Sequence, residues 1–137
     1  MRAFLTLAVL GAASTPAAAV SPAPIAGRWV TVEGKALVEI GACGQHVCGR
    51  IAKVLKVDPT KPTTDTNNPD ATLRTRPIVG MVFLTGFAPD DGRWKGRIYD
   101  PESGKSYRSE LIRSGNTLKV KGCVGPFCRT QVWTAAR

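Results

Sequence analysis

Residues 93–121 read RWKGRIYDPESGKSYRSELIRSGNTLKVK, and this stretch decides the fold. Two turn signals, PESG at 101–104 and SGN at 114–116, divide it into three short segments. In each segment charged and apolar residues alternate, which is the two-residue period of a β-strand with one buried face. We therefore predict three consecutive antiparallel strands joined by tight turns.

The same pattern continues in both directions from this stretch. No segment after residue 22 shows a helical period, and β-favouring runs alternate with turn signals. The sequence therefore predicts an all-β protein, a single up-and-down antiparallel β-barrel of about eight strands. The expected strands are 27–32, 36–40, 47–56, 79–87, 93–100, 105–113, 117–124 and 127–135.

The apolar faces of these strands are predicted to share one interior. A barrel of eight strands is either filled by its side chains or holds one small ligand, and the sequence leaves both outcomes open. Gly96 and Ser109 are small enough to leave room between larger neighbours. In the hollow case we expect a ligand cavity lined by Trp94, Gly96, Ile98, Tyr107, Ser109, Leu111 and Val120.

Residues 57–76 interrupt the regular spacing with a long polar stretch rich in Pro, Thr, Asp and Asn. This composition predicts a loop, with one helical turn at 70–74. The strand that follows, 79–87 (VGMVFLTGF), is apolar on both faces. We therefore expect the loop to fold back over the outer side of that strand.

The first nineteen residues predict a secretory signal peptide. Arg2 supplies the positive start, residues 3–13 form an apolar run too short to span a bilayer, and Ala17 to Ala19 offer a small-residue cleavage site. A buried N-terminal helix is the alternative, but the run has no amphipathic stripe. We expect cleavage after Ala19, a single domain at 20–137, and a location in the periplasm or outside the cell.

Four cysteines form two C-x4-C units, Cys43/Cys48 and Cys123/Cys128, and each unit brackets a predicted hairpin turn. In an oxidising compartment this spacing favours two local disulfides. A four-cysteine zinc site is the alternative, and it requires both hairpin tips to meet and to stay reduced. We expect the disulfides, no metal and no cofactor.

The net charge of +9 comes from 19 Lys and Arg against 10 Asp and Glu. Such a surface either attracts anionic partners, such as lipid head groups or acidic glycans, or only keeps the domain soluble. There is no tight basic run and no basic helix, so nucleic acid is not expected as a partner.

An enzyme is the least favoured class. His46 is the only histidine, and it lies between two cysteines without an acidic residue nearby in the sequence. The motifs G-x-S-x-G, H-E-x-x-H and the P-loop are absent. The acidic pairs Asp90–Asp91 and Asp100/Glu102 fall in turns, where Asp is favoured for conformational reasons. We therefore expect no catalytic residues.

The motifs together resemble the bacterial domain-of-unknown-function 2147 family over essentially the whole of residues 20–137. The most specific part is IYDPESGKSY at 98–107. The other motifs are Gly27-x-Trp29, Cys43-Gly44-x-x-x-Cys48-Gly49, Gly80 with its apolar run, Arg93-Trp94-x-Gly96, Gly122-Cys123 to Cys128, and Gln131-x-Trp133. The resemblance implies an exported protein with a lipocalin- or calycin-like barrel, and implies no activity.

Gly27-Arg28-Trp29 also resembles the lipocalin G-x-W motif on the first strand. That resemblance implies that Trp29 plugs the closed end of the barrel beneath an arginine from near the last strand. Arg129 is the residue that we assign to this role, with Arg137 as the alternative. The chain departs from the expected Trp-Thr-Arg ending, because Trp133-Thr134 is followed by two alanines.

Two functions remain open from the sequence. The first is a lipocalin-like binding protein of the cell envelope for a small apolar or amphipathic ligand, anionic lipid included, with peripheral membrane contact. The second is an interaction module with a filled core. It would recognise an envelope component or a host protein through the tips at 44–47 and 124–127 and the loop at 57–76. The sequence does not address the oligomeric state.

Overall fold

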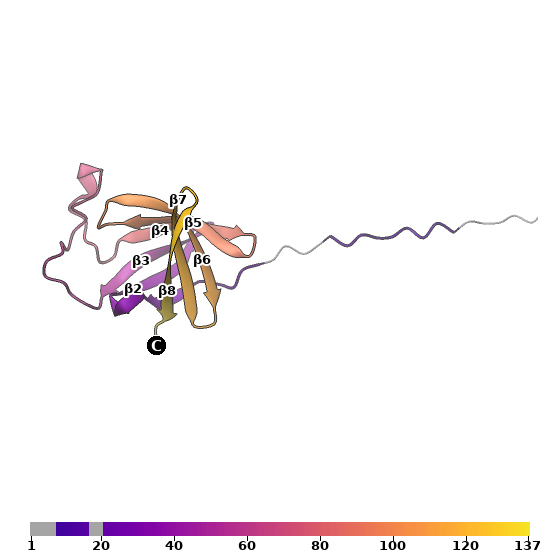
Figure 1. Ribbon diagram of the computed structural model, residues 1–137, viewed down its shortest axis with the longest axis horizontal. Coiled ribbons are helices and arrows are strands. Elements are labelled where there is room, and N and C mark those ends of the chain that lie inside the picture. The colour runs from indigo at the N-terminus through magenta and orange to yellow at the C-terminus, as the bar shows by residue number, and fades with distance from the viewer. Residues whose placement is uncertain (1–7, 17–20) are drawn as a thin grey trace, which may run out of the picture.

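The computed structural model describes residues 8–16 and 21–137, and residues 27–135 form a closed barrel (Figure 1). Every strand pairs antiparallel with the next, and β8 closes on β1 through Trp29↔Ala135 and Val30↔Thr134. The predicted fold class, a single up-and-down antiparallel barrel, is confirmed. The strands are β1 Gly27–Val30, β2 Ala36–Cys43, β3 His46–Val54, β4 Val82–Asp90, β5 Arg93–Asp100, β6 Lys105–Ser114, β7 Thr117–Val124 and β8 Phe127–Ala135.

The strand boundaries differ from the prediction mainly in β1 to β4, and β2 runs on to Cys43 where the prediction ended it at residue 40. β1 is shorter than expected and leads into a 3-10 turn, η1 Val32–Gly34, in which Glu33 has a φ of 61°. β4 begins at Val82 because Gly80, with a φ of 91°, bends the chain just before it. The expected helical turn at 70–74 is present as η2 Ala71–Leu73, which Asp70 caps.

Large side chains fill much of the barrel interior. The buried core includes Leu84, Phe87, Leu111 and Trp133. A Cβ atom on Gly96 would lie 2.7 Å from Cγ of Phe87 and 2.6 Å from the carbonyl oxygen of Thr85. The expectation that Gly96 leaves room in the interior is therefore wrong, because the ring of Phe87 occupies that space.

One end of the barrel is closed by Trp29 and by the segment that precedes β1. The indole Nε1 of Trp29 donates to the carbonyl oxygen of Ile25 at 3.0 Å, and both side chains are buried. The guanidinium of Arg113 lies 5.1 Å from the Trp29 ring and donates to the carbonyl of Pro24 at 3.1 Å. Such a contact combines cation–π attraction with a charged hydrogen bond.

Arg113 therefore holds the position that the sequence predicted for Arg129. Arg113 comes from β6, two residues after Leu111, whose buried side chain shares its face. Arg129 is exposed on β8 opposite Gly122, away from Trp29, so its assignment was wrong.

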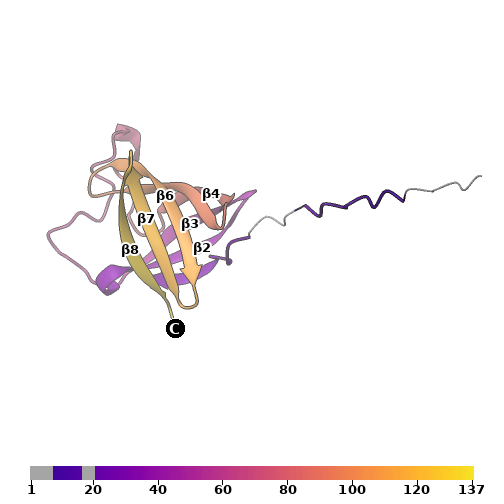
Figure 2. The same cartoon turned by 45° about the vertical axis from the view of Figure 1, so that its right-hand side comes forward.

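The two disulfides, Cys43–Cys48 and Cys123–Cys128, lie at opposite ends of the barrel. Strand connections alternate between the ends, so the β2–β3 tip lies at the closed end and the β7–β8 tip at the open end (Figure 2). The predicted pairing is confirmed, and the four-cysteine zinc alternative does not hold. Within the described ranges, no three His, Cys, Asp or Glu side chains are grouped as a metal site would require.

Residues 8–16 are exposed and form no helix or strand (Figure 1). The predicted cleavage site after Ala19 lies outside the described residues. Among the residues that are described, none of the helices has the length and apolar character needed to cross a membrane.

Substituting Gly96→Ala is expected to lower the free energy of unfolding by about 1–3 kcal/mol, because the new methyl group overpacks against Phe87. Gly122→Ala is the matched control on β7, since its Cβ would meet only Cγ2 of Ile98, at 3.8 Å. Urea unfolding curves of both variants measure the difference. Equal midpoints for the two variants would contradict the filled interior.

Candidate functional site

The long β3–β4 loop is organised around one buried carboxylate, that of Asp65, whose exposure is 0%. Its Oδ2 atom accepts hydrogen bonds from Nδ2 of Asn68 at 2.8 Å and from Nε of Arg76 at 2.9 Å. Its Oδ1 atom accepts from the hydroxyl of Tyr99 at 2.7 Å. Because a buried charge is tolerated only when it is paired and hydrogen-bonded, this arrangement fixes the loop to β5.

The electrostatics of this cluster favour a charged Asp65 and a neutral Tyr99. Burial alone would raise the pKa of Asp65, but the bonds from Asn68, Tyr99 and Arg76 outweigh it and lower the pKa below its usual value. Burial and the adjacent Asp65 carboxylate raise the pKa of Tyr99 to about 12. The guanidinium of Arg76 also lies 5.5 Å from the Tyr99 ring centre. The cluster therefore stays intact across the physiological pH range.

A second set of contacts joins the loop to the β5–β6 turn. The side-chain amide of Asn67 donates to the carbonyl oxygen of Glu102 at 2.9 Å. A Cβ on Gly104 would lie only 2.0 Å from the carbonyl oxygen of Asn67, so glycine is required for this approach. The loop therefore packs against β5 and its following turn.

This position corrects the expectation that the loop covers the outer side of 79–87. Val79 and Val82 keep 50% and 44% of their surface exposed. The physical reason is that the loop is fixed to β5, where Tyr99 presents its hydroxyl to the buried Asp65.

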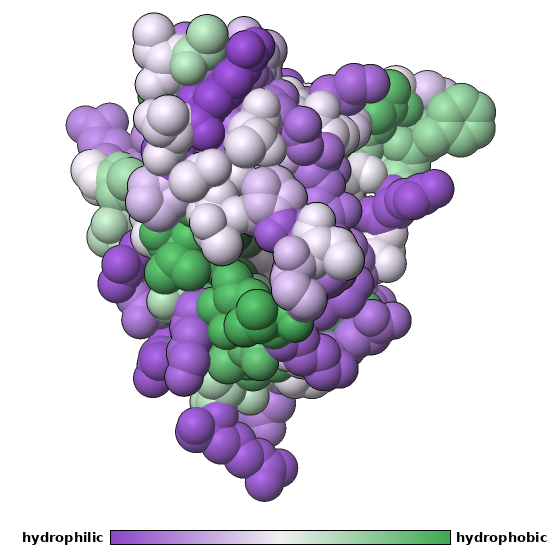
Figure 3. All heavy atoms as spheres, turned by 90° about the vertical axis from the view of Figure 1, so that its left-hand side faces the viewer, coloured by the Kyte–Doolittle hydropathy of each residue, from purple (hydrophilic) through white to green (hydrophobic). Residues whose placement is uncertain are grey.

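Between the loop and the barrel lies a pocket of about 520 Å³ at the open end, here called the mouth pocket. Its apolar wall is formed by the end of β3 and the segment before β4, and Figure 3 shows apolar surface around a hollow on this face of the molecule. The lining residues are Val54, Lys56, Val57, Asp58, Thr60, Lys61, Pro62, Thr63, Thr64, Asn67, Ile78, Val79, Pro101 and Glu102.

Some charged side chains of the mouth pocket have partners elsewhere in the described chain, and one does not. Lys61 forms an ion pair with Glu102 across the pocket, from the loop to the β5–β6 turn. The carboxylate of Asp58 accepts from the backbone and hydroxyl of Thr60. Lys56 makes no ion pair with any carboxylate in the described part of the chain. Its ammonium group is therefore free to meet a negative group of a ligand.

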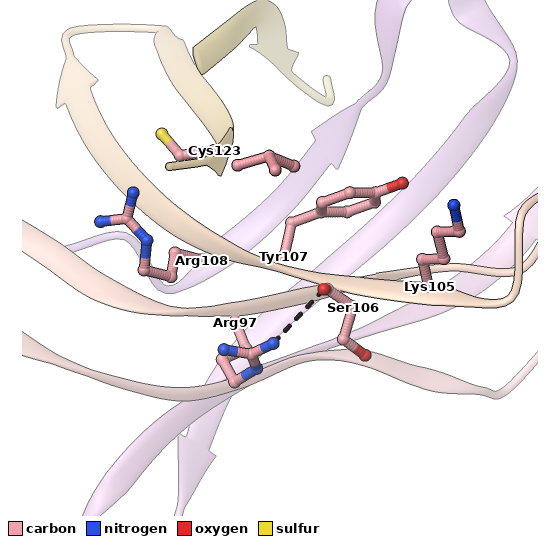
Figure 4. A pocket seen from close by; sticks show the side chains of 7 residues that line it. Arg97, Lys105, Ser106, Tyr107, Arg108 and Cys123 are labelled. Carbon is pink, nitrogen blue, oxygen red and sulfur yellow. Dashed lines mark hydrogen bonds between the residues drawn. The ribbon is translucent and has the colours of Figure 1, made fainter. Parts of the chain in front are cut away.

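A second pocket, of about 460 Å³, lies at the same end near the β7–β8 tip and is here called the arginine pocket (Figure 4). Arg97 and Arg108 are register partners on β5 and β6, and their guanidinium groups point in different directions (Figure 4). The guanidinium of Arg97 donates to the carbonyl oxygen of Ser106 at 3.3 Å, and that of Arg108 donates to the carbonyl of Gly125. The remaining lining residues are Lys105, Tyr107, Cys123 and Val124.

The seven residues predicted to line a ligand cavity are not brought together around either pocket. Ser109, Leu111 and Val120 are buried in the filled core, and the hydroxyl of Ser109 has no hydrogen-bond partner in the ranges that the structure describes. Trp94 lies at the closed end, where its Nε1 donates to the carbonyl of Ala23 at 2.9 Å. Gly96 lies beneath Phe87, and Ile98 packs against the core. Tyr107 alone lines one of the two pockets described above.

Comparison with known proteins supports the barrel. A family model described as "Uncharacterized protein conserved in bacteria (DUF2147)" matches residues 27–135, so the chain belongs to this family. Among solved structures, a Helicobacter pylori protein described as belonging to the lipocalin family is similar, with a TM-score of 0.70 and 22% identity. The match covers 83% of this chain and 84% of that one. No match was found among curated proteins.

Asp65→Asn is expected to detach the loop, because the substitution removes the charge that Arg76 and Tyr99 bind. Losing charged hydrogen bonds of this kind costs about 2–3 kcal/mol, so trypsin should cleave the loop after Arg74 at least about tenfold faster. Asp70→Asn is the control, since asparagine caps η2 as well as aspartate does. Unchanged cleavage in the Asp65 variant would show that the loop is held by other contacts.

The titration of Tyr99 reports the same cluster directly. In a Tyr107→Phe background Tyr99 is the remaining tyrosine of the chain. Its tyrosinate absorbance at 295 nm should then appear with a midpoint near pH 12, because the pKa is raised to about 12. Adding Asp65→Asn should move the midpoint down toward the ordinary value of about 10. A midpoint near 10 before that second substitution would contradict the buried pair.

Proposed function

We propose that this member of the family is a non-enzymatic binding protein that holds a small amphipathic molecule in the mouth pocket. The observation that carries the proposal is the pocket itself. Its volume of about 520 Å³ lies within the range of small-molecule sites. Its lining combines an apolar wall with a few charged groups, which is the composition that suits an amphipathic ligand.

The filled interior limits how deep such a ligand enters. Leu84 packs over Gly49 and Phe87 over Gly96, so these two small positions offer no space for a chain inside the barrel. The ligand's apolar part is therefore placed against Val54, Ile78 and Val79 at the open end. This is a shallower site than the cavity predicted from the sequence.

The charges favour a ligand with an acidic head group. Lys56 lines the pocket without an ion-pair partner among the described residues, whereas Lys61 is already paired with Glu102. A carboxylate or phosphate placed beside Lys56 gains a charge-assisted hydrogen bond. The pocket thus favours an anionic amphiphile over a neutral one.

The disulfides and the first nineteen residues support an exported location for this binding protein. Both disulfides are consistent with an oxidising compartment such as the periplasm or the outside of the cell, and residues 1–19 have the pattern of a secretory signal. His46, the residue on which a hydrolase would depend, lies on the β2–β3 tip at the closed end, away from the pocket. We therefore assign the pocket a binding role without catalysis.

Titration calorimetry with dodecanoate and dodecanol, each below its aggregation limit, tests the proposal. Dodecanoate should bind more tightly than dodecanol. Val79→Ser should weaken both by about fivefold, because about 1 kcal/mol of apolar burial is lost. Val82→Ser is the matched control, since Val82 is similarly exposed but lies outside the pocket. Absence of saturable binding, or equal losses in the two variants, would refute the mouth pocket as the site.

A further inference from the structure

The β7–β8 tip exposes two apolar side chains on a rigid support. Val124 and Phe127 are register partners on either side of the turn, and 62% and 81% of their surfaces are exposed. The disulfide Cys123–Cys128 joins the two strands directly beneath them. The tip therefore presents an aromatic and an aliphatic group to solvent without a core residue to cover them.

The base of this tip carries unneutralised positive charge. Arg97 and Arg108 lie directly opposite each other on neighbouring strands, an arrangement that is unfavourable between like charges. Neither arginine forms an ion pair with a carboxylate in residues 21–137. Lys105 lines the same pocket, and Arg108 is bonded to the carbonyl of Gly125 in the tip itself. An anion bound in this pocket would offset the positive charge of the two arginines.

We propose that the β7–β8 tip docks the protein on an anionic lipid surface. In this arrangement Phe127 and Val124 enter the interfacial layer, and the arginine pocket receives lipid phosphate groups. Arginine suits this role because its planar guanidinium binds phosphate through two parallel hydrogen bonds. Basic residues near an anionic leaflet each contribute about 1 kcal/mol of attraction.

The size of the apolar patch favours a lipid surface over a protein partner. Two exposed apolar side chains are far less than the area of about 800 Å² per partner that a stable protein interface buries. A membrane needs no shape complementarity, and it offers many phosphates to the several cationic groups around the tip. Charge complementarity and a small apolar wedge together match a peripheral lipid contact.

Flotation with vesicles tests this proposal, using the mature chain with its disulfides intact. The protein should float with phosphatidylglycerol–phosphatidylcholine vesicles and not with phosphatidylcholine alone. Phe127→Ser should weaken binding about tenfold, because a partly inserted phenylalanine contributes about 1.5 kcal/mol. Val132→Ser is the matched control, since Val132 on β8 is 49% exposed and lies away from the tip. The variant at Phe127 should fold normally because 81% of the surface of Phe127 is exposed.

The double variant Arg97→Gln/Arg108→Gln should also weaken vesicle binding by about tenfold or more. Lys53→Gln/Lys119→Gln removes the same charge from exposed positions elsewhere and should have a much smaller effect. Equal loss in both double variants would mean diffuse charge attraction and would overturn the proposal. Full binding by the Phe127 variant would overturn it too. So would saturable binding of inorganic phosphate without vesicle binding, or capture of a purified envelope protein in place of vesicles.

Discussion

The buried carboxylate of Asp65 is the interaction on which the open end of this barrel depends. A loop rich in polar residues cannot hold its shape by apolar burial, so its conformation must come from hydrogen bonds. Asp65 provides them by joining Asn68 and Arg76 within the loop to Tyr99 on β5. Once this point is fixed, Asn67 reaches the β5–β6 turn, and the space left between loop and barrel becomes the mouth pocket. Without Asp65 the loop that forms one wall of the pocket would lose its buried attachment to β5.

Most of the architecture follows from alternation along the sequence, and the exceptions have local causes. The β5–β6–β7 meander was predictable because its turns and its polar–apolar period agree. The start of β4 was misplaced because an apolar run does not reveal that Gly80 bends the chain. The arginine that lies over Trp29 was expected near the last strand, by resemblance. Arg113 shares the face of Leu111, so its inward position followed from the same alternation.

The pockets were harder to foresee than the fold. Nothing in the loop sequence distinguishes the buried Asp65 from the exposed Asp58 or Asp70, because its burial depends on a tyrosine thirty-four residues away. The arginine pair, by contrast, was available in the sequence. A turn at 101–104 that sets Asp100 opposite Lys105 also sets Arg97 opposite Arg108. The interior was misjudged because glycine in a strand indicates either space or a close neighbour, and here the neighbours are Leu84 and Phe87.

The seam of the barrel has a consequence for how the molecule comes apart. β8 spans Phe127–Ala135, yet it pairs with the short β1 at only two positions, Trp29↔Ala135 and Val30↔Thr134. Every other pair of neighbouring strands has more paired positions than this seam, although bulges interrupt some of the registers. Thermal fluctuations should therefore open the cylinder into a curved sheet by separating this seam first, with Trp29 as the main resistance to opening. The amide protons of the seam would then exchange with solvent ahead of those in the β5–β6–β7 meander.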